Sequence, residues 1–510
     1  MLIGHRVAVA QRWIAAVLLL LLLLATPGLS AVSGQSPRPD SPPFPSIPLA
    51  GTLTTSLAAS LIDGTPRSSP AALPAAASPI VATPVVEIAC TDPCLVRFDA
   101  SPATTNALAR TGMRPSLTSD TAIWVGGTPA DLALLVARGA EPVFIMDATP
   151  SLMLYAVTQP IGDTARSPIE AFGTVLDRDG PTSIVEVPSV PAVIVDLTTV
   201  GFRVEKLTPY VPAGTPLLTA DGTASLPDVT EVTETFPDLS TAEIERSIRD
   251  LASTGVEPGQ PGSRFFSLPG NAIAAEYLFL RFAAFGLAVW FEDFVASTGI
   301  LSVNVVAEIP GTDPSQIYAA FAHFDTISED VPGNDEAPGA LDNGTGLAVL
   351  LENARVLADY RLHYPLRFVA LGVEEIGPQA ATAFGTRHVE LGTPFAGGIN
   401  IDSVGTAYGE RRLVVNASET SAFIQTVLLE QYDAFGFDLN ILPRQNPGII
   451  SDETPLTEYG IPTILVASVL FGDPLINCSC DTIDGVDLDY VRATGRLVLL
   501  TVAVLTSRPA

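Results

Sequence analysis

The sequence predicts an α/β protein in which a central mixed sheet flanked by helices follows a smaller N-terminal α/β domain. Three observations favour this fold class. Strand and helix patterns alternate after residue 240, a weaker repeat of strands and helices precedes them, and the composition supports a large core. The chain has 510 residues, of which 47% are hydrophobic and 16% are charged, which is enough for two folded units.

The first residues have the three regions of a secretory signal peptide. His5, Arg6 and Arg12 precede an apolar run from Trp13 to Ala25, and small residues follow. We therefore expect a signal peptide over residues 1–33 and a secreted or extracytoplasmic protein. The apolar run is shorter than the roughly 20 residues that span a bilayer, so we expect no stable membrane association after signal cleavage.

A linker and a repeat domain are expected next. Residues 34–84 are rich in Pro, Ser, Ala and Thr, as in a flexible linker. Residues 85–227 contain a weak βαβ-type repeat of roughly sixty residues, and each copy reads strand, helix, strand, helix, strand. The four helices are expected at 102–111, 129–139, 167–176 and 190–201. The domain is either a propeptide-like or partner-binding module or a purely structural unit.

The charge balance limits the partners. With 55 acidic and 26 basic residues, the formal net charge is −29. Such a surface repels phosphate backbones and anionic membranes, so we expect no nucleic acid partner. The acidity by itself indicates solubility, and the sequence indicates no oligomeric state.

Residues 228–510 show the alternation of an α/β sheet covered by helices. Ser240 and Glu243 fit a capping box at the start of a helix over residues 240–253. Further helices are expected at 271–286, 345–358, 420–435 and 489–507, and strands at 301–309, 317–325, 366–373, 396–404, 413–417 and 463–468. Acidic residues at the ends of successive strands mark the edge where such sheets place their sites.

Four stretches at those strand ends carry groups that can bind a metal. They are AHFDT with His323 and Asp325, GALDNGTG with Asp342, LGVEEIG with Glu374 and Glu375, and NIDSVG with Asp402. Each stretch alone is more often a structural pair, a solvated edge or a turn. Together in one crevice, an imidazole and several carboxylates form a donor set that suits Zn²⁺.

In this order and at these spacings, the set resembles the co-catalytic zinc exopeptidases of the bacterial leucyl aminopeptidase and aminopeptidase Y type. The resemblance covers roughly residues 240–507. It includes PGSRFFSLPGNAIAAEYLFLRFAAFGLAV before the site and PGALDNGTGLAVLLENARVL around Asp342. It implies a zinc exopeptidase-like catalytic domain over residues 228–510.

The resemblance also implies a role for each residue. His323 and Asp402 are then terminal ligands of one metal, and Asp342 bridges to a second metal. Glu375 is a terminal ligand of that second metal, and Glu374 is the general base. Asp325 orients the His323 imidazole. These roles suit the chemistry, because a metal lowers the pKa of a bound water toward about 7 and a nearby carboxylate can take its proton.

The late loop departs from the family pattern. Relatives carry a histidine in Tyr-His-Thr, followed shortly by Asp-Thr, whereas this chain reads INCSCDT and keeps only Asp481 and Thr482. Counting back from Asp481 puts Asn477 at the position of the histidine, unless the loop is shortened and the position is deleted. A neutral amide oxygen is a weak zinc ligand, so we expect one firm Zn²⁺ site and a doubtful second one.

Other residues could fill the gap. His363 and His388 are the remaining histidines outside the leader and the metal site, and we expect both at the surface. Cys478 and Cys480 could offer thiolates, but export favours disulfides, and the four cysteines, which include Cys90 and Cys94, allow three pairings.

A second departure lies in SDETP at 451–455. Glu453 stands there where relatives often carry a histidine. This change concerns the substrate pocket and leaves the fold unaffected.

Three functions are consistent with these residues, and we expect the first. The first is a secreted zinc-dependent metallopeptidase, an aminopeptidase-like exopeptidase that hydrolyses peptide substrates with Glu374 as general base. The alternative is a non-catalytic binding or scaffold protein on the same fold, with a decayed second metal site. A third is hydrolysis or amide exchange on a non-peptide substrate, because one fold hosts several chemistries.

Overall fold

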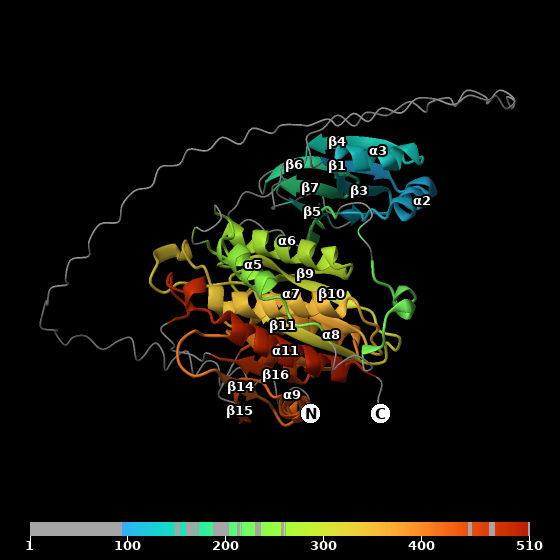
Figure 1. The fold of residues 1–510 in the computed structure, drawn as a ribbon. Coiled ribbons are helices and arrows are strands. Elements are labelled where there is room, and N and C mark those ends of the chain that lie inside the picture. The colour runs from blue at the N-terminus through green and yellow to red at the C-terminus, as the bar shows by residue number, and fades with distance from the viewer. Residues whose placement is uncertain are drawn as a thin grey trace, which may run out of the picture. The chain divides into compact units, whose positions relative to one another are not determined.

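The structure is a computed structural model, shown as a ribbon in Figure 1. It describes residues 94–147, 154–159, 169, 173–186, 203–211, 215, 217–229, 236–256, 260, 262–446, 451–468 and 475–507. The chain divides into two compact units, Met1–Pro79 and Ile80–Ala510, and every described residue belongs to the second. The predicted signal peptide, the predicted linker, Cys90 and the helix expected at 190–201 lie outside the described residues.

Two four-stranded sheets carry the predicted repeat. Their orders are β2-β3-β1-β4 and β6-β7-β5-β8, so the two copies place successive strands alike. Helices α2 (Pro102–Thr111) and α3 (Pro129–Ala137) confirm the two helices predicted for the first copy, and Ser101 and Thr128 cap them. The strands are β1 (Cys94–Asp99), β2 (Leu117–Thr118), β3 (Ala122–Gly127), β4 (Pro142–Asp147), β5 (Leu154–Thr158), β6 (Thr174–Asp179), β7 (Thr182–Glu186) and β8 (Arg203–Lys206).

The strand pairing of these sheets corrects one expectation. β1 pairs antiparallel with β3 and β4, and β5 pairs antiparallel with β7 and β8, whereas βαβ units make parallel pairs. The helix expected at 167–176 is wrong at its C-terminal end, because β6 begins at Thr174. Residues 174–179 pair with β7 across a two-residue turn at Gly180 and Pro181, and this pairing outweighs the local helical pattern.

An eight-stranded mixed sheet forms the larger part of the fold, as predicted. Its order is β15-β14-β16-β13-β11-β12-β10-β9. The strands β12, β11, β13 and β16 run parallel to one another, and β10 and β14 join this group antiparallel. At the edges, β9 pairs antiparallel with β10, and β15 pairs parallel with β14. The bounds are β9 (Ala288–Val295), β10 (Leu301–Ile309), β11 (Ile317–His323), β12 (Leu366–Leu371), β13 (Phe395–Asp402), β14 (Arg412–Asn416), β15 (Asn440–Arg444) and β16 (Thr463–Ala467).

Helices cover both faces of this sheet. One core contains residues of α5, α6, α7, α9 and α11 against alternate residues of the strands, such as Val305, Ala320 and Phe368. The opposite face packs Val306, Phe321 and their neighbours against α8 and α10. The helices are α5 (Thr241–Ala252), α6 (Pro269–Ala284), α7 (Gly346–Leu357), α8 (Gln379–Leu391), α9 (Ala422–Phe435), α10 (Glu453–Glu458) and α11 (Leu488–Leu505). Figure 1 shows α5, α7 and α11 side by side.

The predicted helices and strands of this region are confirmed within a few residues, and four elements were not predicted, namely β9, α8, β15 and α10. The start of α5 matches half of the predicted capping box. The Glu243 amide donates to Ser240 Oγ at 3.2 Å, but the Ser240 amide donates to the distant Glu352 at 2.6 Å instead of to Glu243. Among the described residues, no helix combines the length and the apolar character needed to cross a membrane.

Candidate metal centre

The sheet brings His323 and Asp402 together. His323 is the last residue of β11 and Asp402 is the last residue of β13, and these strands are parallel neighbours in which Phe321 pairs with Asn400. The carboxyl ends of parallel neighbours lie at the same edge of a sheet. β12 ends beside them, since Leu371 pairs with His323, and the chain then leads directly to Glu374.

Asp342 completes a group of three possible ligands. His323 Nε2 lies 3.1 Å from Asp342 Oδ1 and 3.3 Å from Asp402 Oδ1. One ligand atom from each of the three residues lies within 4.8 Å of the other two. Apart from the His323 contact, the buried Asp342 Oδ1 has no hydrogen-bond partner among the described residues. One imidazole and two carboxylates in this arrangement fit a Zn²⁺ ion.

Hydroxyl groups hold the Asp402 carboxylate. Ser451 Oγ donates to Asp402 Oδ2 at 2.6 Å, and Ser403 Oγ donates to Oδ1 at 3.1 Å. Ser451 in turn accepts a hydrogen bond from the buried Asn400 amide at 3.0 Å. The carboxylate is thus oriented by groups on two segments that lie far apart in the sequence.

The Asp342 segment is anchored by another acid. It forms a short irregular helix, η7 (Ala340–Thr345), just before α7, and its Asp342–Asn343 peptide is cis. The backbone amides of Leu341 and Asp342 donate to the Asp481 carboxylate at 2.7 and 2.9 Å. Asp481, which the late loop shares with the family pattern, therefore positions the Asp342 backbone.

Asp325 connects the histidine to the two glutamates. His323 Nδ1 lies 3.2 Å from the Asp325 carbonyl oxygen and 3.5 Å from its Oδ1, so Asp325 is placed where it can orient the imidazole. Its carboxylate also accepts the backbone amides of Glu374 at 2.8 Å and of Glu375 at 3.2 Å. The sequence did not predict this second contact, which sets the direction of both glutamates after β12.

Glu375 faces Asn477 from the late loop. With its amide nitrogen turned toward Glu375, Asn477 donates to Oε1 at 3.2 Å and to Oε2 at 3.1 Å. The opposite orientation would set the amide oxygen against two acceptors. The predicted vacancy opposite Glu375 is thus filled by an amide, and among the described residues no histidine or thiolate stands there.

The charges of the site depend strongly on burial. Burial lowers the pKa of His323, but Asp402, Asp325 and Asp342 outweigh burial and hold this pKa well above its ordinary value. Burial raises the pKa of Asp402, but the His323 charge and the hydrogen bonds to the carboxylate bring it below its ordinary value. So many acids in one place favour a bound cation.

Both glutamates are shifted in the same direction. Burial raises the pKa of Glu374 well above its ordinary value, and the nearby Asp452 and Asp402 add to this effect. Burial raises the pKa of Glu375 well above its ordinary value too, with Asp342 as the next cause. The two carboxyls therefore share the environment that is typical of catalytic acids and bases.

A buried arginine supports the segment before Asp342. Arg264 is fully buried, and its guanidinium donates to the carbonyls of Phe324, Leu251, Pro338 and Gly339 at 2.7–2.9 Å. Burial lowers its pKa to about 10, and the nearby acids, with Asp481 first, oppose that shift. Sequence reasoning assigned no role to this residue, because its partners are backbone atoms that only the fold brings together.

Asp452 and Glu453 form a second buried acidic group next to the centre. Among the described residues, the two carboxylate oxygens of Asp452 and Oε2 of Glu453 have no hydrogen-bond partner. Burial raises the pKa of Glu453 to about 7 and that of Asp452 well above its ordinary value. The SDETP departure was visible in the sequence, but the burial of both acids was not.

The remaining histidines do not join the centre. His388 is buried on α8, where Nδ1 lies 2.8 Å from Thr393 Oγ1 and Nε2 lies 3.3 Å from Glu292, so the expectation of a surface residue is wrong. The rings of Phe384 and Phe395 pack against the imidazole, and Thr393 and Glu292 supply the polar partners that a buried histidine needs. His363 is partly exposed beside Asp313.

The late cysteines are bonded to each other. Cys478 and Cys480 form a disulfide across one residue, Ser479. Cys94 is also disulfide-bonded. Neither late cysteine therefore offers a thiolate to a metal.

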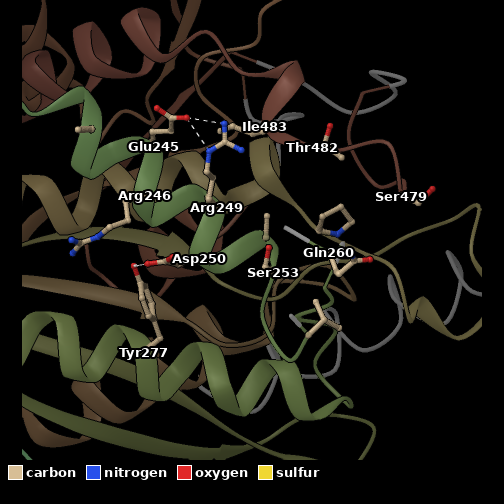
Figure 2. A pocket seen from close by; sticks show the side chains of 14 residues that line it. Glu245, Arg246, Arg249, Asp250, Ser253, Gln260, Tyr277, Ser479, Thr482 and Ile483 are labelled. Carbon is tan, nitrogen blue, oxygen red and sulfur yellow. Dashed lines mark hydrogen bonds and ion pairs between the residues drawn. The ribbon is translucent and has the colours of Figure 1, made fainter. Parts of the chain in front are cut away.

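A separate cavity of about 820 Å³ lies along the outer side of α5 and the late loop. Figure 2 shows Arg249 paired with Glu245 and Tyr277 hydrogen-bonded to Asp250 along its wall, with Ser479 and Thr482 on the opposite side. None of the predicted site residues lines this cavity. It is therefore distinct from the metal centre, although it borders the loop that carries Asn477.

Comparison with known proteins finds similarity in the region of the eight-stranded sheet. Residues 304–502 match the model of Peptidase family M28. A probable zinc metalloprotease of Pyrenophora teres f. teres is 30% identical over 35% of this chain and 42% of its own length. Leupeptin-inactivating enzyme 1 of Streptomyces exfoliatus is 25% identical over 41% of this chain and 46% of its own length.

Further similarity is found to aminopeptidase YwaD of Bacillus subtilis, which is 31% identical over 32% of this chain and 33% of its own length. The LapA aminopeptidase of Legionella pneumophila has a solved structure with a TM-score of 0.47 and 14% identity, over 82% of this chain and 99% of that chain. The chain spans less than half the length of the curated relatives it matches here. Residues 304–502 are therefore similar to peptidase family M28, and the relatives of this region are named as zinc metalloproteases and aminopeptidases.

Proposed function

We propose that this protein is a secreted zinc-dependent aminopeptidase that hydrolyses peptide substrates, with Glu374 as general base. The observation that carries the proposal is the group of His323, Asp342 and Asp402, whose ligand atoms lie within 4.8 Å of one another at the carboxyl edge of the sheet. Three protein ligands are sufficient for a catalytic zinc ion. The match of residues 304–502 to peptidase family M28 and the relatives named as aminopeptidases support the reaction class.

The zinc ion would be held by His323, Asp342 and Asp402. When bound, it lowers the pKa of water toward about 7 and polarises the carbonyl group of a peptide bond. His323 presents Nε2 toward both carboxylates, because Asp325 lies on the Nδ1 side of the ring. Ser451 and Ser403 keep Asp402 in one orientation, so that the ion meets a pre-formed set of donors.

Glu374 moves the proton. The backbone amide of Glu374 donates to the Asp325 carboxylate, and Asp325 also contacts His323. Asp325 therefore positions the Glu374 backbone relative to the His323 imidazole. Glu374 takes a proton from the attacking water and then delivers it to the amine that leaves as the peptide bond breaks. Proton transfer by one positioned group contributes typically 10²–10⁴-fold to the rate.

Export is part of the same proposal. The charged, apolar and small-residue regions of residues 1–33 support it, and so does the Cys478–Cys480 disulfide, because disulfides persist in oxidising compartments. The proposal predicts that a host secretes the chain and removes its leader. N-terminal sequencing of protein from the culture medium tests this point, and retention of the full chain inside the cell would contradict it.

A substrate panel tests the reaction. Purified protein loaded with Zn²⁺ should hydrolyse aminoacyl amides and short peptides, lose this activity with a chelator and regain it when Zn²⁺ is returned. N-acetylated versions of the same peptides are the matched control, because an aminopeptidase requires a free amino terminus. If zinc-loaded protein cleaves nothing in a broad panel, the proposal is wrong.

The alternative is a non-catalytic binding protein on the same fold. The amide of Asn477 at Glu375 favours it, because this position belongs to the departure from the family pattern. The alternative predicts a folded protein that binds peptides without cleaving them. Calorimetric binding of an uncleaved peptide, with no product detected by mass spectrometry, would support it over the aminopeptidase.

A further inference from the structure

The late loop from Leu475 to Thr482 is tied down on both sides of Asn477. The Glu329 amide donates to the Asn477 carbonyl oxygen at 2.8 Å. Two residues later, Ser479 donates to Asp330 from its amide and from its hydroxyl, both at 2.8 Å. The disulfide between Cys478 and Cys480 closes the tip of the loop around Ser479. Asn477 is therefore held in place by contacts that do not involve its own side chain.

The backbone conformation of Asn477 directs its side chain toward Glu375. Its φ is 58°, in the left-handed region that asparagine enters more readily than most residues other than glycine. From there the amide reaches both oxygens of Glu375, at 3.2 and 3.1 Å. Glu375 is itself fixed by the Asp325 carboxylate through its backbone amide. Two separately anchored segments thus meet in one amide–carboxylate contact.

This contact takes the place of a metal ligand. A zinc ion next to Glu375 would need the lone pairs of that carboxylate together with nitrogen, sulfur or charged oxygen ligands. The Asn477 amide directs two N–H bonds at those lone pairs, and its own oxygen is a weak ligand for zinc. The neighbouring cysteines are oxidised, so they cannot supply the missing ligand either.

We propose that Asn477 replaces a second metal ion, and that the protein holds a single zinc at His323, Asp342 and Asp402. The inference rests on the proposed function for the presence of that zinc. In a two-ion centre the carboxylate of Glu375 is neutralised by the second cation. Here the amide hydrogens of Asn477 supply a smaller positive charge to the same carboxylate. Asp342 would then coordinate one zinc ion and would not bridge two.

Metal content measured on the full-length mature protein tests the inference. After dialysis against excess Zn²⁺ and removal of loose ions, we expect about one zinc per chain in the wild type. Asn477→His restores a nitrogen ligand beside Glu375 and should raise the content to about two. Asn440→His, at an exposed position on β15, is the matched control and should stay at about one.

Anomalous diffraction provides a second readout that needs no variant. Crystals soaked in Zn²⁺ should show one peak between His323 and Asp402 and none beside Glu375. Parallel soaks in Mn²⁺ and Ca²⁺ are included, because Asp342, Glu375 and the Asn477 oxygen together could suit a hard cation. Any ion found beside Glu375 in the wild type overturns the inference.

The remaining outcomes separate the inference from the proposed function. Two ions per wild-type chain would overturn the inference and leave the aminopeptidase proposal intact. An Asn477→His protein that folds and still binds one zinc would show that Asn477 does not keep the second ion out, which also overturns it. A wild type without zinc would contradict the proposed function together with the inference.

Discussion

The carboxyl edge of the larger sheet has two halves, one around His323 and one around Glu375, which differ in the groups that contact their carboxylates. At the His323 half, an imidazole and two carboxylates converge, and Asp342 Oδ1 has no other partner among the described residues. At the Glu375 half, both carboxylate oxygens face an amide. Carboxylates at one edge of the sheet therefore form one half that suits a cation and another half whose carboxylate is paired with an amide.

This difference shows that acidic residues alone do not define a metal site. What distinguishes the halves is the group on the opposite segment, which is a histidine on β11 in one case and Asn477 on the late loop in the other. A buried carboxylate needs a partner, and either a cation or a hydrogen-bond donor can supply it.

The largest effect is expected from His323→Ala, which removes the only nitrogen donor of the three-residue group. Zinc content should fall to background, and the proposed peptidase activity should fall by on the order of 10⁴-fold or more. Metal analysis and a kinetic assay on the same preparation measure both effects. His363→Ala is the matched control, because His363 lies partly exposed beside Asp313, and it should change neither quantity.

Next comes the contrast between Glu374→Gln and Glu375→Gln. Glu374→Gln should lower kcat by roughly 10²–10⁴-fold while zinc content stays unchanged, because the variant loses a proton acceptor but no zinc ligand. Glu375→Gln should also keep its zinc, with a loss in kcat of less than about tenfold, because its partner is the Asn477 amide. Equal losses in kcat for the two variants would contradict the proposed difference between the His323 half and the Glu375 half.

A smaller effect is expected from Asp325→Asn, because Asp325 positions His323 without binding the zinc itself. The substitution alters the acceptor beside His323 Nδ1 and weakens the carboxylate that holds the Glu374 and Glu375 amides. Zinc affinity should fall about 10–100-fold, as is typical when a partner of a metal ligand is lost. Competition with a chromogenic chelator measures this change, and an unchanged affinity would show that the backbone carbonyl of Asp325 suffices.

The smallest effect concerns stability and pH at Glu453. Burial raises the pKa of Glu453 from 4.5 to about 7, so the stabilisation that goes with the neutral form is complete below pH 4.5 and is lost as the pH rises through 7. Glu453→Gln keeps a neutral group and should be more stable than the wild type by about 3 kcal/mol at pH 8 and by less than about 1 kcal/mol at pH 5. Thermal unfolding at the two pH values measures the difference, and a gain at pH 5 as large as at pH 8 would contradict the prediction.

The sequence predicted most of the larger sheet because its signals are local. The strand at 301–309 was predicted at its observed bounds, and α7 and α11 within two residues, since periodicity in apolar residues is a property of neighbouring positions. β15 and α10 are short and lack a strong pattern, so they were not predicted. In the N-terminal sheets the alternation was visible, but the antiparallel pairing was not, because pairing depends on residues far apart in the chain.

For the site, the identity of the acids and of His323 came from the sequence, and so did the position of Asn477 in the late loop. The tertiary structure decided what these residues meet. The fold pairs the Asp325 carboxylate with the backbone amides of Glu374 and Glu375, and the Asp481 carboxylate with those of Leu341 and Asp342. It also places the Asn477 amide against the Glu375 carboxylate. Residue types and their spacing set which chemistry is available, whereas the partner of each buried charge is set by segments up to 140 positions apart, which only folding brings within hydrogen-bond distance.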